Sequence, residues 1–139
     1  MKVLQEISSM SYGRRGRTGS YSENPSHVLV EISYTPEFSQ MLKEGKYKYY
    51  QIIQTVAFML NNIIEHDDNG AGKFVSYNVK DYGVDSDDYN LTISFDLKDE
   101  YKGKYSYDEF SDMVKVICNT IIDLLDTSDI ADDGSDKYI

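Results

Sequence analysis

A segment of twenty residues occurs twice in this chain. Residues 45–64 read GKYKYYQIIQTVAFMLNNII and residues 103–122 read GKYSYDEFSDMVKVICNTII, and the two align without a gap. Eight positions are identical: Gly45, Lys46, Tyr47, Tyr49, Val56, Asn61, Ile63 and Ile64 match Gly103, Lys104, Tyr105, Tyr107, Val114, Asn119, Ile121 and Ile122. A repeat of this length predicts a chain built from one structural unit used twice.

The repeated segments predict helices, and the residues before them predict strands. Each copy carries apolar residues at helical spacing, which indicates a long helix with one buried side. Alternating β-branched runs precede the copies at Val28 to Tyr34 and Tyr89 to Leu97. Val30 to Tyr34 aligns with Leu91 to Phe95, so the strands repeat as well.

The first strand of each unit is predicted at Lys2 to Ser8 and Lys73 to Asp81. The resulting fold class is α+β, with an internally duplicated strand-strand-helix unit. We expect a four-stranded antiparallel sheet with two long helices on one face.

The chain is expected to form a single α+β domain over residues 1–126. The first unit covers about 1–66 and contains a flexible basic loop at 8–27, and the second covers about 73–125. Residues 127–139 read as an acidic, disordered tail.

Two helix starts carry local signals. Thr35 can cap a short helix that reaches Glu44, with Pro36 at its first position. Ser106 and Glu109 have the spacing of a capping box, so the second long helix should begin there.

Charge divides the chain into two unequal parts. The net charge is −10, but residues 1–80 sum to +1 and residues 81–139 to −11. Such a field repels nucleic acid and attracts a basic protein surface. The carboxylates expected to form an acidic binding surface are Asp85, Asp87, Asp88, Asp99 and Glu100.

The loop at 8–27 has a sharp chemical pattern. Arg14, Arg15 and Arg17 can each fork onto phosphate, and glycines between them let the backbone approach. Tyr12 and Tyr21 flank the arginines and can stack on unpaired bases or on side chains of a partner. The alternative is a mobile surface loop whose charge offsets the acidic half.

Catalytic motifs are not found in the sequence. The two histidines lie far apart, no nucleotide-binding fingerprint occurs, and the single cysteine, Cys118, sits at a buried helix position. We expect no enzyme, no metal and no cofactor. A metal-dependent nuclease would need the carboxylates of the acidic turn, which are consecutive and read instead as a solvated turn: Asp81, Asp85, Asp87 and Asp88.

Tyrosines gather at the two predicted helix starts, and the repeat suggests that the two groups are neighbours across a pseudo-twofold axis. Exposed tyrosine beside acid is good interface chemistry. The members are Tyr47, Tyr49, Tyr50, Tyr101, Tyr105 and Tyr107.

No run of 18 apolar residues occurs, and the N-terminus is too polar for a signal peptide. The protein is therefore expected in the cytoplasm, without a membrane partner. A homodimer is compatible with the sequence.

The segment Ser11-Tyr12-Gly13-Arg14-Arg15 beside a small acidic, tyrosine-rich domain resembles phage-encoded anti-CRISPR proteins, which inhibit RNA-guided DNA-cleaving nucleases. Here the basic arm lies inside a hairpin instead of at a terminus. The resemblance implies a stoichiometric inhibitor in the host cytoplasm that evades antiviral defence. Its acidic surface would act as a nucleic acid mimic in a basic channel, and the arginine loop would touch guide RNA or an acidic protein patch.

Two other functions remain open from the sequence. One is a single-stranded nucleic acid or RNA binding protein that uses the arginine-glycine loop. The other is a phage structural subunit, since pseudo-twofold α+β domains suit assembly.

Overall fold

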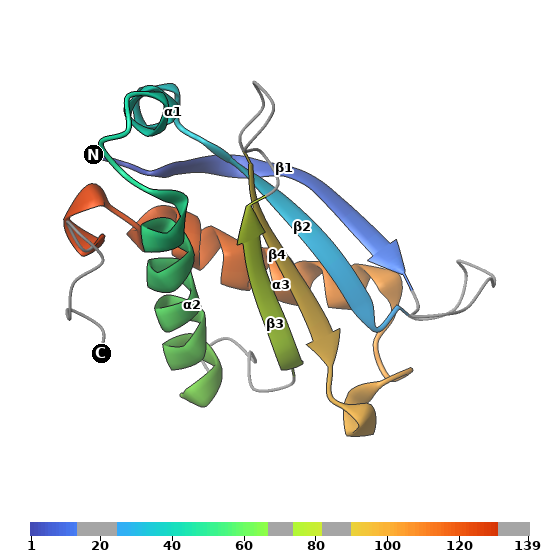
Figure 1. The fold of residues 1–139 in the computed structure, drawn as a ribbon. Helices are drawn as coiled ribbons and strands as arrows, with labels where there is room; N and C mark the ends of the chain where they lie inside the picture. Colours follow the sequence, from blue (N-terminus) through green and yellow to red (C-terminus); the bar gives the residue numbers. More distant parts are fainter. Residues whose placement is uncertain (14–24, 67–73, 82–89, 131–139) are drawn as a thin grey trace.

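The computed structural model describes residues 1–13, 25–66, 74–81 and 90–130, with only the backbone of 74–81. Within this part of the chain, no helix is both long and apolar enough to cross a membrane. The elements in chain order are β1 (Leu4–Gly13), β2 (His27–Tyr34), α1 (Pro36–Lys43), α2 (Tyr49–Glu65), β3 (Phe74–Asp81), β4 (Asn90–Leu97), the 3-10 turn η2 (Asp99–Tyr101), α3 (Tyr107–Leu124) and the 3-10 turn η3 (Thr127–Asp129) (Figure 1).

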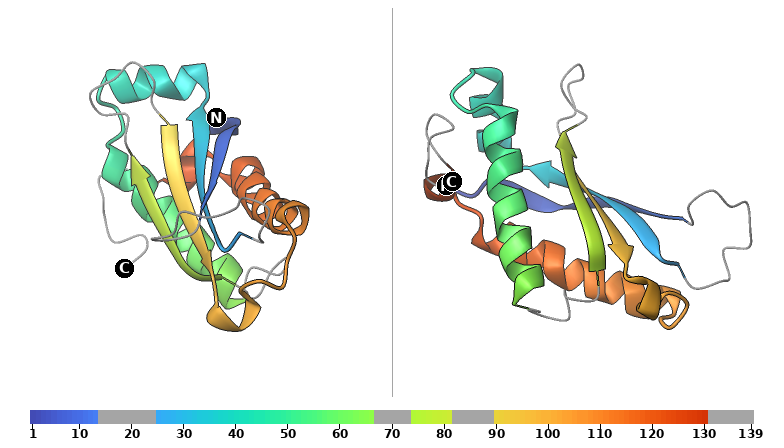
Figure 2. Two further views of the ribbon diagram at one scale, coloured as in Figure 1. Left: turned by 90° about the vertical axis from the view of Figure 1, so that its right-hand side faces the viewer. Right: turned by 60° about the horizontal axis from the view of Figure 1, so that its bottom comes forward.

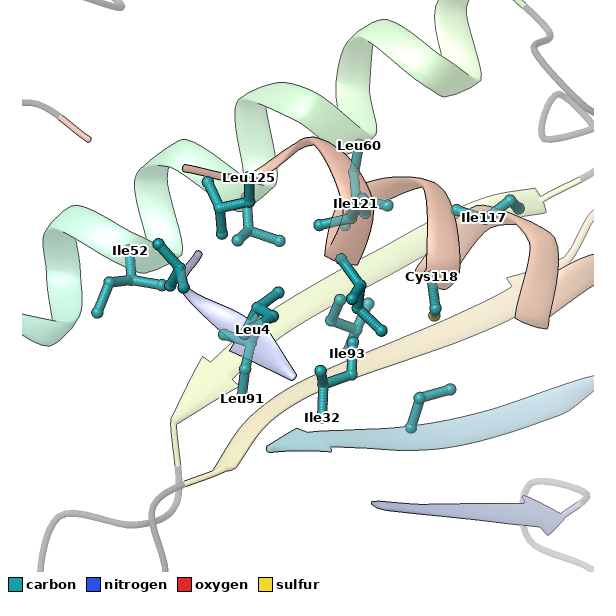
Figure 3. Close-up of a cluster of buried hydrophobic side chains, with 14 of the residues drawn as sticks. Leu4, Ile32, Ile52, Leu60, Leu91, Ile93, Ile117, Cys118, Ile121 and Leu125 are labelled. Carbon is teal, nitrogen blue, oxygen red and sulfur yellow. The ribbon is translucent and has the colours of Figure 1, made fainter. Parts of the chain in front are cut away.

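The strands form one antiparallel sheet in the order β1-β2-β4-β3. Alternate residues of β2, such as Val30 and Ile32, are fully buried, and so are Leu91 and Ile93 of β4. In Figure 3 the side chains of Ile32, Leu91 and Ile93 point toward side chains of α2 and α3, among them Leu60 and Ile121. The apolar side of the sheet and the apolar stripes of the helices thus share one core.

The central strand pair has the symmetry that the repeat predicts. Glu31 of β2 lies opposite Thr92 of β4, and these two positions are equivalent in the aligned units. On either side, Val30 pairs with Ile93 and Ile32 pairs with Leu91. Exchanging the two units therefore leaves the register unchanged, so a pseudo-twofold axis passes through the Glu31–Thr92 pair.

Each long helix packs against the edge strand of the other unit. α2, from the first unit, packs against β3, and α3, from the second, packs against β1. Figure 2 shows the two helices crossing each other as they do so. The two units are therefore interlocked through their helices.

The segments that lead into α2 and α3 share a backbone conformation. Gly45 has φ +77° and Gly103 has φ +79°, both in the left-handed region that glycine adopts without strain. Four residues after each glycine the helix begins. This match in conformation supports the duplication that the sequence indicates.

The local signals at two helix starts are confirmed. The Glu109 carboxylate accepts from the Ser106 backbone N–H at 2.9 Å, and the Ser106 hydroxyl accepts from the Glu109 N–H at 3.2 Å. Thr35 caps α1 by accepting from the Phe38 N–H at 3.3 Å, and Pro36 is the first residue of that helix.

The predicted fold, a duplicated strand-strand-helix unit that forms a four-stranded antiparallel sheet with two long helices, is wrong in its arrangement. The described residues contain three α-helices, because the short helix expected between Thr35 and Glu44 forms as α1 and buries Phe38 and Leu42 four residues apart, so that the two units differ. The corresponding connection after β4 forms only η2, in which no residue is buried. The described side chains define three strands of the sheet, β1, β2 and β4, and β3 adds its backbone along β4.

Several predicted boundaries also change. β1 continues to Gly13 and β2 begins at His27, so residues 8–13 are strand and not part of a flexible loop. The segments 14–24, 67–73, 82–89 and 131–139 lie outside the described residues. The expected tail begins too early at residue 127, because Ile130 is 2% exposed and joins the core.

The N-terminal residues lie against the end of α3. Lys2 donates from Nζ to the carbonyls of Ile122 at 3.1 Å and Asp123 at 2.9 Å, where helix carbonyls have no partner in the helix. The Thr127 N–H donates to the Met1 carbonyl at 3.0 Å. The Asp126 carboxylate accepts from the Ser128 N–H at 3.1 Å and contacts the Met1 amino nitrogen at 3.0 Å.

Replacing either repeat glycine should destabilise the fold by a similar amount. A Cβ built at Gly45 or Gly103 meets no described atom within 4 Å, so the penalty comes from the left-handed backbone alone. We expect Gly45→Ala and Gly103→Ala each to lower the free energy of unfolding by about 1–2 kcal/mol in urea titrations. Asparagine at the same positions should lower it less, since asparagine tolerates this conformation. Equal losses for alanine and asparagine would contradict the backbone explanation.

Asp126 should make the fold sensitive to acid. The hydrogen bond from the Ser128 N–H, followed by the Met1 ammonium, lowers the pKa of this carboxyl from 3.8 to about 2. A pKa that is lower in the folded chain stabilises it above about pH 4, and this stabilisation is lost as the pH falls toward 2. Thermal unfolding of Asp126→Asn should show a lower Tm at pH 7 and a weaker dependence on pH between 4 and 2. Asp123→Asn, an exposed carboxylate nearby, is the control, and an unchanged acid dependence in Asp126→Asn would refute the assignment.

Candidate functional site

Tyr12 lies in β1, opposite Val28 of β2, and not in a flexible loop. Its ring centroid is 4.4 Å from that of Tyr107 and 6.1 Å from that of Phe110, both on α3. The prediction that Tyr12 is a free ring for stacking on bases therefore needs correction, because its ring already packs against two aromatic side chains of α3. Tyr107 is the exposed member of this aromatic cluster, with half of its surface accessible.

The Tyr12 hydroxyl donates a hydrogen bond to the Met10 sulfur at 3.7 Å. Burial raises the pKa of the phenol above its ordinary value of 10.0. A hydrogen bond with Ser111 acts in the opposite direction, and the charges of Tyr107 and Asp112 raise the pKa again. Tyr12 thus packs the end of β1 against the first turn of α3 and contacts Tyr107 through its ring.

The ends of three strands meet beside this cluster. Gly13 of β1 lies opposite His27 of β2, which lies opposite Asp96 of β4. The His27 Nδ1 and an Asp96 oxygen are 2.8 Å apart, and each side chain is about a quarter exposed. This pair joins the two central strands at the end of the sheet where β1 stops.

The predicted basic site is only partly described. Arg14 follows Gly13 directly in the sequence, but the three arginines and one tyrosine of the predicted site lie outside the described residues: Arg14, Arg15, Arg17 and Tyr21. Their role as a binding segment stays a prediction. What the structure adds is that the chain reaches Arg14 from a strand end packed on α3.

The predicted acidic surface is also divided. Asp99 and Glu100 are exposed on η2, and Asp99 forms an ion pair of 3.0 Å with Lys102. The other three predicted members lie outside the described residues: Asp85, Asp87 and Asp88.

Sequence reasoning missed an acidic surface on α3. Four of its carboxylates are exposed against one exposed lysine, Lys115, which gives the helix a net charge of −3. The equivalent helix α2 carries one acid and no lysine, a net charge of −1. Helical spacing would have revealed the surface, because the acids lie on the side away from the buried stripe. They are Asp108, Glu109, Asp112 and Asp123.

The two groups of tyrosines pack at their own helix starts. Tyr47 contacts Phe38 of α1 at 5.1 Å between ring centroids, and Tyr101 contacts Tyr105 at 6.4 Å. Among the described ring contacts, none joins the group before α2 to the group before α3. The suggestion that the groups are neighbours across the pseudo-twofold axis is therefore not supported.

Groups with catalytic or metal-binding chemistry are sparse in the part of the chain that the structure describes. No three His, Cys, Asp or Glu side chains there come together to hold a metal ion. The carboxylates of the alternative nuclease site, Asp81, Asp85, Asp87 and Asp88, have no described side chains. Cys118 is buried as predicted, and burial raises the pKa of its thiol to about 12, so it stays protonated.

Comparison of the chain with family models, curated proteins and solved structures finds no match.

Tyr12 should contribute strongly to stability. Removing its ring in Tyr12→Ala takes away the contacts with Tyr107 and Phe110, and we expect the free energy of unfolding to fall by about 2 kcal/mol. Tyr12→Phe keeps the ring and loses the hydroxyl, so it should lower the value by about 1 kcal/mol or less. Tyr50→Ala, at a half-exposed ring on α2, should change it by about 0.5 kcal/mol or less. If Tyr12→Ala behaved like Tyr50→Ala in denaturant titrations, the packing role would be wrong.

Proposed function

We propose that this protein is a non-enzymatic interaction protein that binds an RNA-guided nuclease and blocks its binding or cleavage of DNA. The observation that carries the proposal is the acidic outward side of α3. Asp108, Asp112 and Asp123 are all exposed there, on a rigid helix whose other side is anchored in the core. A carboxylate surface on a rigid support can occupy a basic channel that otherwise holds phosphates.

The difference between the two pseudo-equivalent helices supports this proposal. α2 and α3 occupy corresponding places in the fold, so packing makes the same demand on both. Their outward charges nevertheless differ, −1 against −3. Glu109 is explained by the capping box with Ser106, but packing does not require Asp108, Asp112 and Asp123, and a partner with a basic surface gives these three a purpose.

The arginine segment would provide a second contact of opposite sign. Arg14 follows β1 directly, and the end of β1 packs against the first turns of α3. A partner that carries guide RNA beside a basic DNA channel offers both kinds of surface, since its RNA attracts arginine and its channel attracts carboxylate. This arrangement fits the resemblance to anti-CRISPR proteins.

The test is inhibition of guide-loaded nucleases by charge variants of this protein. In the α3 variant, Asp108, Asp112 and Asp123 become asparagine. In the control variant, three exposed acids on other elements lose their charge, so the net charge matches: Glu6→Gln, Glu37→Gln and Glu65→Gln. We expect the wild-type protein and the control to block DNA binding, and the α3 variant to need about tenfold more protein in gel-shift titrations.

Three results would overturn the proposal. One is that the wild-type protein inhibits none of the loaded nucleases tested. Another is that both variants weaken inhibition equally, since bulk charge would then explain the effect. The third is salt-sensitive binding to a bare oligonucleotide that Arg14→Glu, Arg15→Glu and Arg17→Glu abolish, with no binding to nuclease; it would favour the single-strand binding function instead.

A further inference from the structure

Tyr107 is an exposed aromatic ring that the fold holds in a fixed place. Half of its surface is accessible, although it is the first residue of α3, a helix with one side buried in the core. Its ring is tilted by 50° to that of Tyr12 at a centroid distance of 4.4 Å. Tyr12 in turn packs against Phe110, and its hydroxyl donates to the Met10 sulfur at 3.7 Å. A ring supported in this way loses little freedom on binding, which favours a role as an anchor.

The charges around Tyr107 indicate which side chain fits against it. Asp108 is the next residue, and Asp112 lies one helical turn after Asp108 on the same side of α3. Both carboxylates are exposed. A guanidinium group can stack on an aromatic face and at the same time donate hydrogen bonds in its plane to carboxylates. A phosphate has neither a planar face nor a positive charge, so it does not fit this site. Charge complementarity therefore selects arginine as the occupant.

We propose that Tyr107, with Asp108 and Asp112, takes an arginine side chain of the partner. This inference rests on the proposed function in one respect, because that function makes the arginine part of the basic DNA channel of the nuclease. The aromatic pair carries the proposal, and the carboxylates set the charge of the occupant. Lysine fits less well, since its ammonium has no planar face to stack.

The test uses the full chain and two short peptides, acetyl-Gly-Arg-Gly-Arg-Gly-amide and its lysine counterpart. Binding is followed by NMR titration of backbone and tyrosine ring signals. We expect the arginine peptide to shift signals of Tyr107 and the first turn of α3, with an affinity at least threefold higher than that of the lysine peptide. Equal binding of the two peptides, or shifts confined to other elements, would refute the inference.

The matched variants are Tyr107→Leu and Tyr50→Leu, because the two tyrosines are equally exposed at the starts of pseudo-equivalent helices. Leucine keeps an apolar contact for Tyr12 and removes the aromatic face. We expect Tyr107→Leu to weaken binding of the arginine peptide about fivefold, and Tyr107→Phe and Tyr50→Leu to bind like the wild type. Equal effects of the two leucine variants would contradict the anchor.

The peptide experiment is independent of the nuclease. If the peptide binds at Tyr107 but no nuclease is inhibited, the proposed function fails and the arginine anchor stands. If a nuclease is inhibited through the acids of α3 but the peptide does not bind at Tyr107, the anchor fails and the proposed function stands.

Discussion

The pairing of β2 with β4 is the contact on which the rest of this structure depends. It places Glu31 opposite Thr92 at the centre of the sheet and joins the two repeated units with their registers matched. Every other layer follows from it, because the edge strands extend the sheet outward and the long helices cover its buried side. Residues as far apart as His27 and Asp96 meet only because this register holds.

Local chemistry made parts of this fold predictable from the sequence. The caps at Thr35 and Ser106 and the repeated glycines each act within a few residues, so the residues that determine these features are neighbours in the sequence and can be recognised there. The strand predicted at Lys2 to Ser8 ends too early, because the register of β1 with β2 shifts before Glu6 and again before Ser9. Such bulges break the alternation that identifies a strand, and the apolar residues of β1 no longer fall at every second position.

The candidate site was harder to find for a related reason. Acids that are adjacent in the sequence, such as Asp99 and Glu100, are easily recognised as a group. Asp112 and Asp123 are eleven residues apart, and only the helical geometry of α3 places them on one surface. Tyr12 was assigned to the wrong environment because its partner Tyr107 lies far along the chain. Helix exchange between the units could not be inferred at all, since an apolar stripe does not specify which strand will cover it.

The crossing of each long helix onto the other unit's edge strand bears on the origin of the chain. In a protein of half this length, the helix would lie over the edge strand of a second molecule, so two identical molecules would be needed to close one core. Joining the two copies in one gene removes the requirement that they be the same. The net charges of α3 and α2, −3 and −1, show how far two such copies can differ while they keep the same place in the fold.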